Sequence, residues 1–259
     1  MKILDYGYLE LVESWGSDER IIEAARMSTG KGFLGWGPKG WECHHTGCGW
    51  KTGDVDHPGR CPQCNDGLYS ILGDEKLLRY LWANKHHTPF EMAGLTIEVQ
   101  APIFVFREWH RHRVPFSYNE MSARYAPLPD LNYMPTLERF ALTGGPSKQS
   151  QSLGGRIFDP KTAHLAQQAI DRVYKLAQTE YEAMLESGVS KELARIVLPV
   201  GRYSRMRASA NLRGWLNFLT LRMPAAAQYE IRAYAEALSE TIATLFPRTH
   251  ALFLEGFGK

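Results

Sequence analysis

The stretch RHRVPFSYNEMSARY, residues 111–125, concentrates cations and hydrogen-bonding groups within a short length of chain. It opens with Arg111, His112 and Arg113. Guanidinium forks bind phosphate oxygens through two parallel hydrogen bonds. The stretch is therefore consistent with a solvated surface or with a pocket for a phosphorylated ligand. The polar positions that follow, interleaved with aromatic residues, are Ser117, Asn119, Glu120, Ser122 and Arg124.

Length and composition indicate an ordinary globular protein. The chain has 259 residues, of which 44% are hydrophobic, so it can bury a full core. The formal net charge is only +2, which gives no overall field that would attract nucleic acid. Any anion binding must come from local clusters of arginine.

The first fifteen residues, MKILDYGYLELVESW, carry acidic side chains where a signal peptide has an apolar core. No apolar run reaches about 18 residues, the length that a membrane-spanning helix needs. These features predict a cytoplasmic protein that has no membrane partner.

Hydrophobic periodicity predicts an α+β fold in which helices are in the majority. Residues 126–160 are rich in Pro, Gly and Ser and are expected to form a loop. Strands are expected near the N-terminus, at 94–100 and at about 201–209. Helices are expected at about 17–28, 74–87, 103–113, 161–186, 190–198, 211–222 and 225–246.

Residues 31–73 lack helical periodicity and are dominated by Gly, Pro, Trp, Cys and His. All four cysteines of the chain lie here, in the pattern C-x4-C-x12-C-x2-C. Two cysteine knuckles supply the four thiolates of a tetrahedral metal site, and the segment has too few apolar residues to fold without such a staple. His44, His45 and His57 are possible substitute ligands. The predicted ligands are Cys43, Cys48, Cys61 and Cys64, with residues 1–30 and 74–259 forming the other domain.

This four-cysteine pattern resembles zinc ribbons and, through the CPQC knuckle at 61–64, rubredoxin-like modules. The first resemblance implies structural zinc. The second implies iron and electron transfer. Zinc is the preferred interpretation.

The remainder of the chain resembles flavin-dependent thymidylate synthases, the ThyX family. RHR at 111–113, eight further residues and then Ser122 correspond to the family signature. Other matching blocks follow in order along the chain. They are EAARMS (23–28), HHTPFE (86–91), APIFVFREW (101–109), ESGVSKELARIVLP (186–199) and NLRGWLNFLTLR (211–222).

The resemblance implies a central antiparallel sheet flanked by helices, and a homotetramer with FAD bound among the subunits. It also implies methylation of dUMP to dTMP, with carbon from 5,10-methylenetetrahydrofolate and hydride from flavin that NADPH has reduced. Nucleic acid is not an expected partner.

The resemblance also implies a role for individual residues. Arg222 and Ser122 are expected to act in catalysis, Arg222 by stabilising charge that develops on the pyrimidine and Ser122 without acting as a nucleophile. Substrate binding is expected for Glu108, Arg111, Glu120, Ser122, Arg124, Arg195 and Arg222. FAD binding is expected for Ser28, His86, Thr88, Arg111, His112, Arg113, Glu120, Asn211, Arg213 and Asn217.

Three positions depart from the family pattern. Glu108 replaces a usual glutamine, and Met92 and Ala226 replace common histidines. A carboxylate at 108 could accept a hydrogen bond from the amino group of cytosine, so dCMP is an alternative substrate. Hydroxymethylation is an alternative reaction. A zinc-ribbon nucleic-acid-binding protein on a degenerate enzyme scaffold is a more remote alternative.

Overall fold

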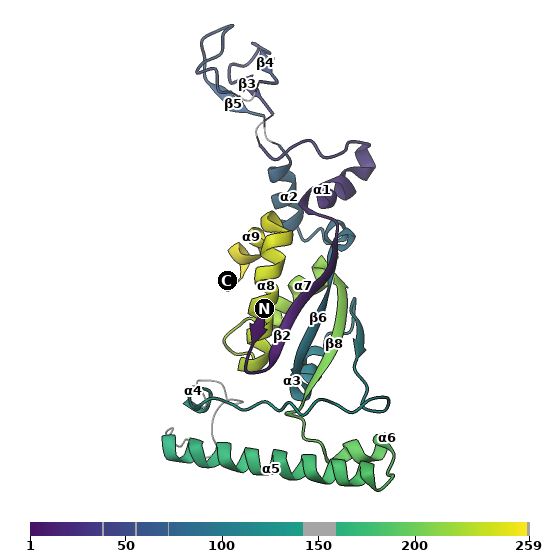
Figure 1. Cartoon of the computed structure of the whole chain (residues 1–259). Helices are drawn as coiled ribbons and strands as arrows, with labels where there is room; N and C mark the ends of the chain where they lie inside the picture. The colour runs from purple at the N-terminus through teal and green to yellow at the C-terminus, as the bar shows by residue number, and fades with distance from the viewer. Residues whose placement is uncertain (38, 55, 72, 142–158, 258–259) are drawn as a thin grey trace.

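A five-stranded antiparallel sheet is the centre of the computed structural model, which describes residues 1–257 except 38, 55, 72 and 142–158. The strand order is β1-β2-β6-β8-β7 (Figure 1). This arrangement confirms the expected α+β fold. The strands are β1 (Lys2–Ile3), β2 (Gly7–Trp15), β6 (Gly94–Pro102), β7 (Ser117–Glu120) and β8 (Tyr203–Asn211).

The alternating sequence of β6 determines which face of the sheet is covered. Leu95, Ile97 and Val99 are fully buried, whereas Glu98 and Gln100 on the opposite face are partly exposed. Side chains alternate between the two faces of a strand, so one face joins the core and the other remains polar. Within the described chain, the polar face carries cross-strand hydrogen bonds such as that between Thr96 and Ser209.

Helices cover the apolar face of the sheet (Figure 1). Their core contacts include Trp109 packed against Phe218, with ring centroids 4.8 Å apart, and Trp215, whose indole N–H donates to the carbonyl of Leu95. Large aromatic side chains supply much of the apolar area that such a core buries. The helices are α3 (Ile103–Trp109), α7 (Leu212–Arg222), α8 (Tyr229–Leu245) and α9 (Pro247–Gly256).

The other helical segments lie toward the two ends of the sheet. Ser17 caps α1 as expected, because its hydroxyl accepts from the N–H of Arg20. The segments are α1 (Asp18–Arg26), η1 (Met27–Thr29), α2 (Asp74–Ala83), η2 (Thr88–Met92), α4 (Leu137–Ala141), α5 (Pro160–Glu186), α6 (Lys191–Ala194) and η4 (Arg195–Val197).

Several expected boundaries were wrong. The helix expected at 103–113 ends at Trp109 instead. The Tyr118 hydroxyl donates to the carbonyls of Trp109 and His112, at 3.2 and 2.7 Å. Strand β7 and helices α4 and α9 were not anticipated. Residues 142–158 of the loop expected at 126–160 lie outside the described residues.

A second, three-stranded sheet lies within residues 31–73 (Figure 1). Its order is β4-β3-β5, and Figure 1 shows it projecting beyond α1 and α2, away from the main sheet. This arrangement supports the proposal that residues 31–73 form a separate module. The strands are β3 (Trp41–Cys43), β4 (Lys51–Thr52) and β5 (Leu68–Ser70).

Asp74 joins the base of this module to the main domain. Its buried carboxylate accepts from the N–H of Leu34 at 2.6 Å and from the guanidinium of Arg26, and its own N–H donates to the carbonyl of Gly35 at 2.8 Å. The approach is close, because a Cβ on Gly73 would lie only 2.2 Å from the carbonyl oxygen of Gly37. The Asp74 carboxylate thus joins Leu34, near the start of the module, to the residue that directly follows its end.

None of the helices within the described ranges combines the length and the apolar character that crossing a membrane requires.

Replacing Asp74 should destabilise the main domain. Asp74→Ala leaves Arg26 and the N–H of Leu34 without their buried acceptor, which costs about 3 kcal/mol. A loss of that size lowers the thermal midpoint by roughly 6–12 °C in a domain of this length. Scanning calorimetry measures the change. The control is Asp171→Ala, which breaks an exposed ion pair with Lys175 and should shift the midpoint by less than about 2 °C. Equal shifts in both variants would contradict the role of Asp74.

Candidate functional site

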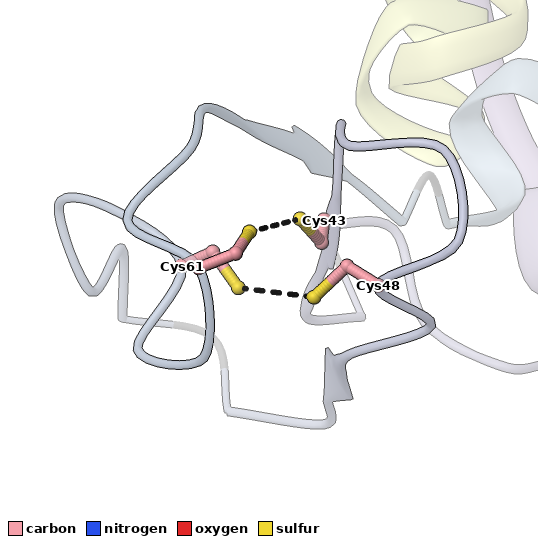
Figure 2. Close-up of side chains that lie close together, drawn as sticks. Cys43, Cys48 and Cys61 are labelled. Carbon is pink, nitrogen blue, oxygen red and sulfur yellow. Dashed lines mark hydrogen bonds between the residues drawn. The ribbon is translucent and has the colours of Figure 1, made fainter.

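The four cysteines converge at the tip of the inserted module. Their sulfur atoms all lie within 4.8 Å of one another, with Cys43–Cys64 at 3.3 Å and Cys48–Cys61 at 3.8 Å. Figure 2 shows the labelled side chains of Cys43, Cys48 and Cys61 pointing toward a common centre. Thiolates at about 2.3 Å from a tetrahedral ion are about 3.8 Å apart, so the sulfur arrangement fits such an ion.

Backbone N–H groups favour the thiolate of Cys61, whereas burial raises the pKa of the Cys43 thiol. Burial opposes ionisation of Cys61, but the N–H groups of Cys64 and Gln63 donate to its sulfur and hold the pKa of this thiol at about 7. The N–H of His45 donates to the sulfur of Cys43 at 3.3 Å. The candidate substitute ligands make other contacts, because His44 packs on Tyr69 and His57 accepts from the N–H of Gly59.

In the main domain, Arg222 is held by two residues of the segment that follows β6. Its Nη1 donates to the Glu108 carboxylate at 2.6 Å, and its Nη2 donates to the Glu108 carbonyl at 3.1 Å. Its Nε donates to Nε2 of His112 at 2.9 Å. The structure therefore brings together three of the residues expected from the sequence, from the ends of α3 and α7.

His112 is neutral at pH 7 in this environment. Burial is the largest cause, and the adjacent Arg222 cation is the second, while Glu108 opposes them; together they lower the pKa of His112 to about 4. Because Nε2 accepts a hydrogen bond from Arg222, the imidazole proton lies on Nδ1. The ring packs against Phe218, with centroids 4.8 Å apart, which accounts for the burial.

Ser122, Arg124 and Arg195 form a second group, beside α6. The N–H of Arg124 donates to the Ser122 hydroxyl at 3.3 Å, and its guanidinium lies 3.4 Å from the Glu192 carboxylate. Nε of Arg195 donates to the Glu192 carbonyl at 3.3 Å. Two cations beside a serine suit an anionic ligand such as a phosphate. Glu192 was not among the predicted site residues, although it lies inside the matching block at 186–199.

A third group surrounds the start of α7. The amide oxygen of Asn211 accepts from the N–H of Gly214 at 2.9 Å, so it caps the helix and leaves only its N–H groups for a ligand. Arg213 forms an ion pair with Glu91 of η2. Glu91 was not among the predicted site residues, although it lies inside the matching block HHTPFE (86–91). Asn217, His86 and Thr88 are exposed at or near these elements.

The two arginines of the RHR motif lie at the surface of the described chain. Arg111 and Arg113 are exposed, and neither side chain has an ion pair with any other residue in the described part of the chain. Glu120 lies on β7 opposite Met206, and Ser28 lies exposed in η1. Two exposed guanidinium groups, two residues apart in the sequence and without an ion pair in the described chain, can bind phosphate oxygens, so these residues fit a dinucleotide cofactor.

The groups do not form one pocket within a single chain. Ser122, Arg124 and Arg195 lie near α6, whereas Asn211 and Arg213 lie at the far end of β8, near α1 and α2 (Figure 1). Nine strand residues at about 3.3 Å each separate these ends by roughly 25–30 Å. The structure thus brings Arg222, Glu108 and His112 together and leaves the second and third groups apart.

A family model described as "Thymidylate synthase complementing protein" matches residues 10–248. The chain belongs to this family. Curated relatives named "Flavin-dependent thymidylate synthase" from Wolbachia pipientis wMel and Thermosipho africanus (strain TCF52B) are both 34% identical to it over 254 residues. These alignments cover 98% of this chain, and they cover 76% and 93% of the two relatives. The family resemblance seen in the sequence is confirmed.

A solved structure has a similar fold. It is that of a UMP/dUMP methylase, PolB from Streptomyces cacaoi, bound with 5-Br dUMP. The TM-score is 0.73 at 30% sequence identity, over 98% of this chain and 97% of that chain. The alignment, which covers 98% of this chain, spans residues 31–73 as well as the main domain.

Proposed function

We propose that this protein is an FAD-dependent thymidylate synthase that methylates dUMP to dTMP with 5,10-methylenetetrahydrofolate and NADPH. The observation that carries the proposal is the Arg222 guanidinium, fixed at the end of α7 by Glu108 and His112. Arg111 and Arg113, which have no ion pair in the described chain, flank His112 in the sequence. A fixed cation together with free phosphate-binding groups suits chemistry on a nucleotide.

FAD would be held by the signature cations and by the residues around the start of α7. Arg111 and Arg113 suit its two phosphates, since both guanidinium groups are exposed and unpaired in the described chain. Asn211, Asn217 and Thr88 supply further polar groups. When bound, FAD supplies the hydride that the methyl group requires, and NADPH is the proposed source of that hydride.

The substrate would be held by its phosphate and by its base. Ser122, Arg124 and Arg195 provide a hydroxyl and two cations for the nucleotide phosphate. Arg222 would stabilise negative charge as it develops on the pyrimidine. Ser122 accepts from a backbone N–H and has no histidine or carboxylate partner in the described chain, so we assign it to substrate positioning rather than to nucleophilic attack.

We propose that several chains complete each site, as in a homotetramer. The second and third groups of site residues lie at opposite ends of β8, so a single site built from both groups would need a second chain. Exposed apolar side chains near α5 and α6 suit such contacts. They are Leu165, Val173, Leu176, Leu193 and Ile196.

We propose that the four cysteines hold structural zinc. The sulfur arrangement fits a tetrahedral ion, and four thiolates with no open position are typical of structural sites. The proposed location of the whole protein is the cytoplasm, where unpaired thiols persist.

The decisive experiment is product analysis. Purified protein is incubated with dUMP, 5,10-methylenetetrahydrofolate, NADPH and FAD, and the nucleotide is analysed by mass spectrometry. The expected product is dTMP, at a rate that depends on every component. A colourless protein that cannot be reconstituted with FAD, or dUMP recovered unchanged, would refute the proposed function.

Arg222→Ala should abolish most turnover and leave the flavin bound. Loss of a group that stabilises developing charge lowers kcat by about 100-fold or more. Flavin absorbance monitors the cofactor, and rapid product analysis measures kcat. Ser122→Ala is the comparison and should be milder, because a binding hydroxyl is removed rather than a nucleophile. Complete loss of turnover in Ser122→Ala with intact nucleotide binding would reopen a nucleophilic role.

The metal can be tested by elemental analysis and chelation. One zinc per chain is expected, and its removal should unfold the inserted module. The flavin should remain bound, because the hydrogen bonds of Asp74 that close the module's base do not involve the cysteines. A red, redox-active protein would indicate iron instead. No metal together with four freely titrating thiols would contradict any metal site.

Methylation of dCMP is a second candidate, favoured by the carboxylate of Glu108. This side chain is 40% exposed beside Arg222, and a carboxylate can accept from the amino group of cytosine. Glu108→Gln should therefore change the ratio of kcat/KM for dUMP over dCMP by at least about tenfold, or roughly 1.4 kcal/mol. An unchanged ratio would show that Glu108 does not read the base.

A further inference from the structure

Residues 108–112 occupy three of the five N–H groups of Arg222. The acceptors are the Glu108 carboxylate, the Glu108 carbonyl and the His112 imidazole, at 2.6, 3.1 and 2.9 Å. A guanidinium group carries one N–H on Nε and two on each terminal nitrogen. No further acceptor contacts Arg222 among the residues that the structure describes, so two N–H groups remain for a ligand, one on Nη1 and one on Nη2.

These acceptors fix the orientation of the guanidinium plane. They contact all three nitrogen atoms, so rotation about the end of the side chain would break at least one hydrogen bond. The acceptors are themselves held. The His112 ring packs on Phe218, and the carbonyl of His112 accepts from the Tyr118 hydroxyl at 2.7 Å.

The charges of the three groups are also matched. His112 accepts through a neutral imidazole, and Glu108 contributes a single negative charge. The side chain of Arg222 is only 16% exposed, so an unpaired cation there would lose hydration without compensation. One carboxylate compensates this cost, and the two remaining N–H groups stay available as donors.

We propose that Glu108 and His112 are positioning residues that hold Arg222 in the orientation from which its two remaining N–H groups reach the pyrimidine. The inference rests on the proposed function. A donor that is already oriented when charge develops loses no conformational freedom during the reaction, and small misplacements of such groups are costly. Glu108 thus acts through Arg222.

A double-mutant cycle tests this role. The enzymes are wild type, Glu108→Ala, Arg222→Lys and the double variant, each assayed for kcat and KM with dUMP and for flavin absorbance. Lysine keeps the positive charge, but its single ammonium nitrogen cannot contact all three acceptors in the way that the guanidinium group does. Glu108→Ala should lower kcat at least tenfold with flavin still bound. The same change in the Arg222→Lys background should lower kcat less than about twofold, because the clamped group is already gone.

Two further variants separate geometry from charge. Glu108→Gln keeps an oxygen that can accept from Nη1, so its kcat with dUMP should lie within about threefold of wild type. Glu108→Asp keeps the charge but is one methylene too short, so its kcat should fall about tenfold. Should Glu108→Ala lose the flavin, this pair decides the question. A Glu108→Asp variant as active as Glu108→Gln, or more active, would refute the proposed positioning of Arg222 by Glu108.

The control breaks an ion pair of the same kind elsewhere. Glu255→Ala removes the partner of Arg79, and both of those side chains are half-exposed far from Arg222 in the sequence. Its kcat should be unchanged. An unchanged or raised kcat in Glu108→Ala, or an equal loss in both backgrounds of the cycle, would refute the inference. A wild-type enzyme without dUMP turnover would instead refute the proposed function.

Discussion

Full-length antiparallel pairing of β6 with β8 constrains the position of the Arg222 group. The register runs from Gly94 opposite Asn211 to Pro102 opposite Tyr203. Helix α3 follows β6 and helix α7 follows β8, so the two helices begin at opposite ends of the same strand pair. Both lie on the apolar face, and their C-terminal ends meet near its middle. Glu108 and Arg222 are therefore neighbours although 114 residues separate them in the sequence.

The same pairing explains why the cluster can be both charged and partly buried. Trp109 and Phe218 pack together directly beneath it, one from each helix, with ring centroids 4.8 Å apart. Aromatic packing on one side lowers the local polarity, which holds His112 neutral and strengthens the ion pair between Arg222 and Glu108. A substrate on the open side would meet oriented donors rather than mobile side chains.

Sequence reasoning predicted the fold class, most of the longer elements and the cysteine cluster, because each depends on local periodicity or spacing. It failed where long-range contacts decide. The pattern at 110–113 predicts a continuing helix, yet α3 ends at Trp109, whose carbonyl accepts a hydrogen bond from the Tyr118 hydroxyl on β7. The contact of Arg222 with His112 was also missed, since it depends on strand register rather than on sequence spacing. The resemblance supplied most proposed residue roles, and those roles remain predictions.

The proposed module at residues 31–73 is joined to the main domain at one short segment. Asp74, directly after the end of the module, forms hydrogen bonds with Leu34 and Gly35 near its start. These contacts form a neck, a short closed connection between the module and the main domain. The cost of closing such a loop grows only with the logarithm of its length. Trp36 strengthens the neck, because its indole N–H donates to Glu19 at 2.8 Å and its ring lies under the Arg248 guanidinium at 4.5 Å. The proposed zinc ion would therefore stabilise the cysteine segment independently of the sheet that positions Arg222.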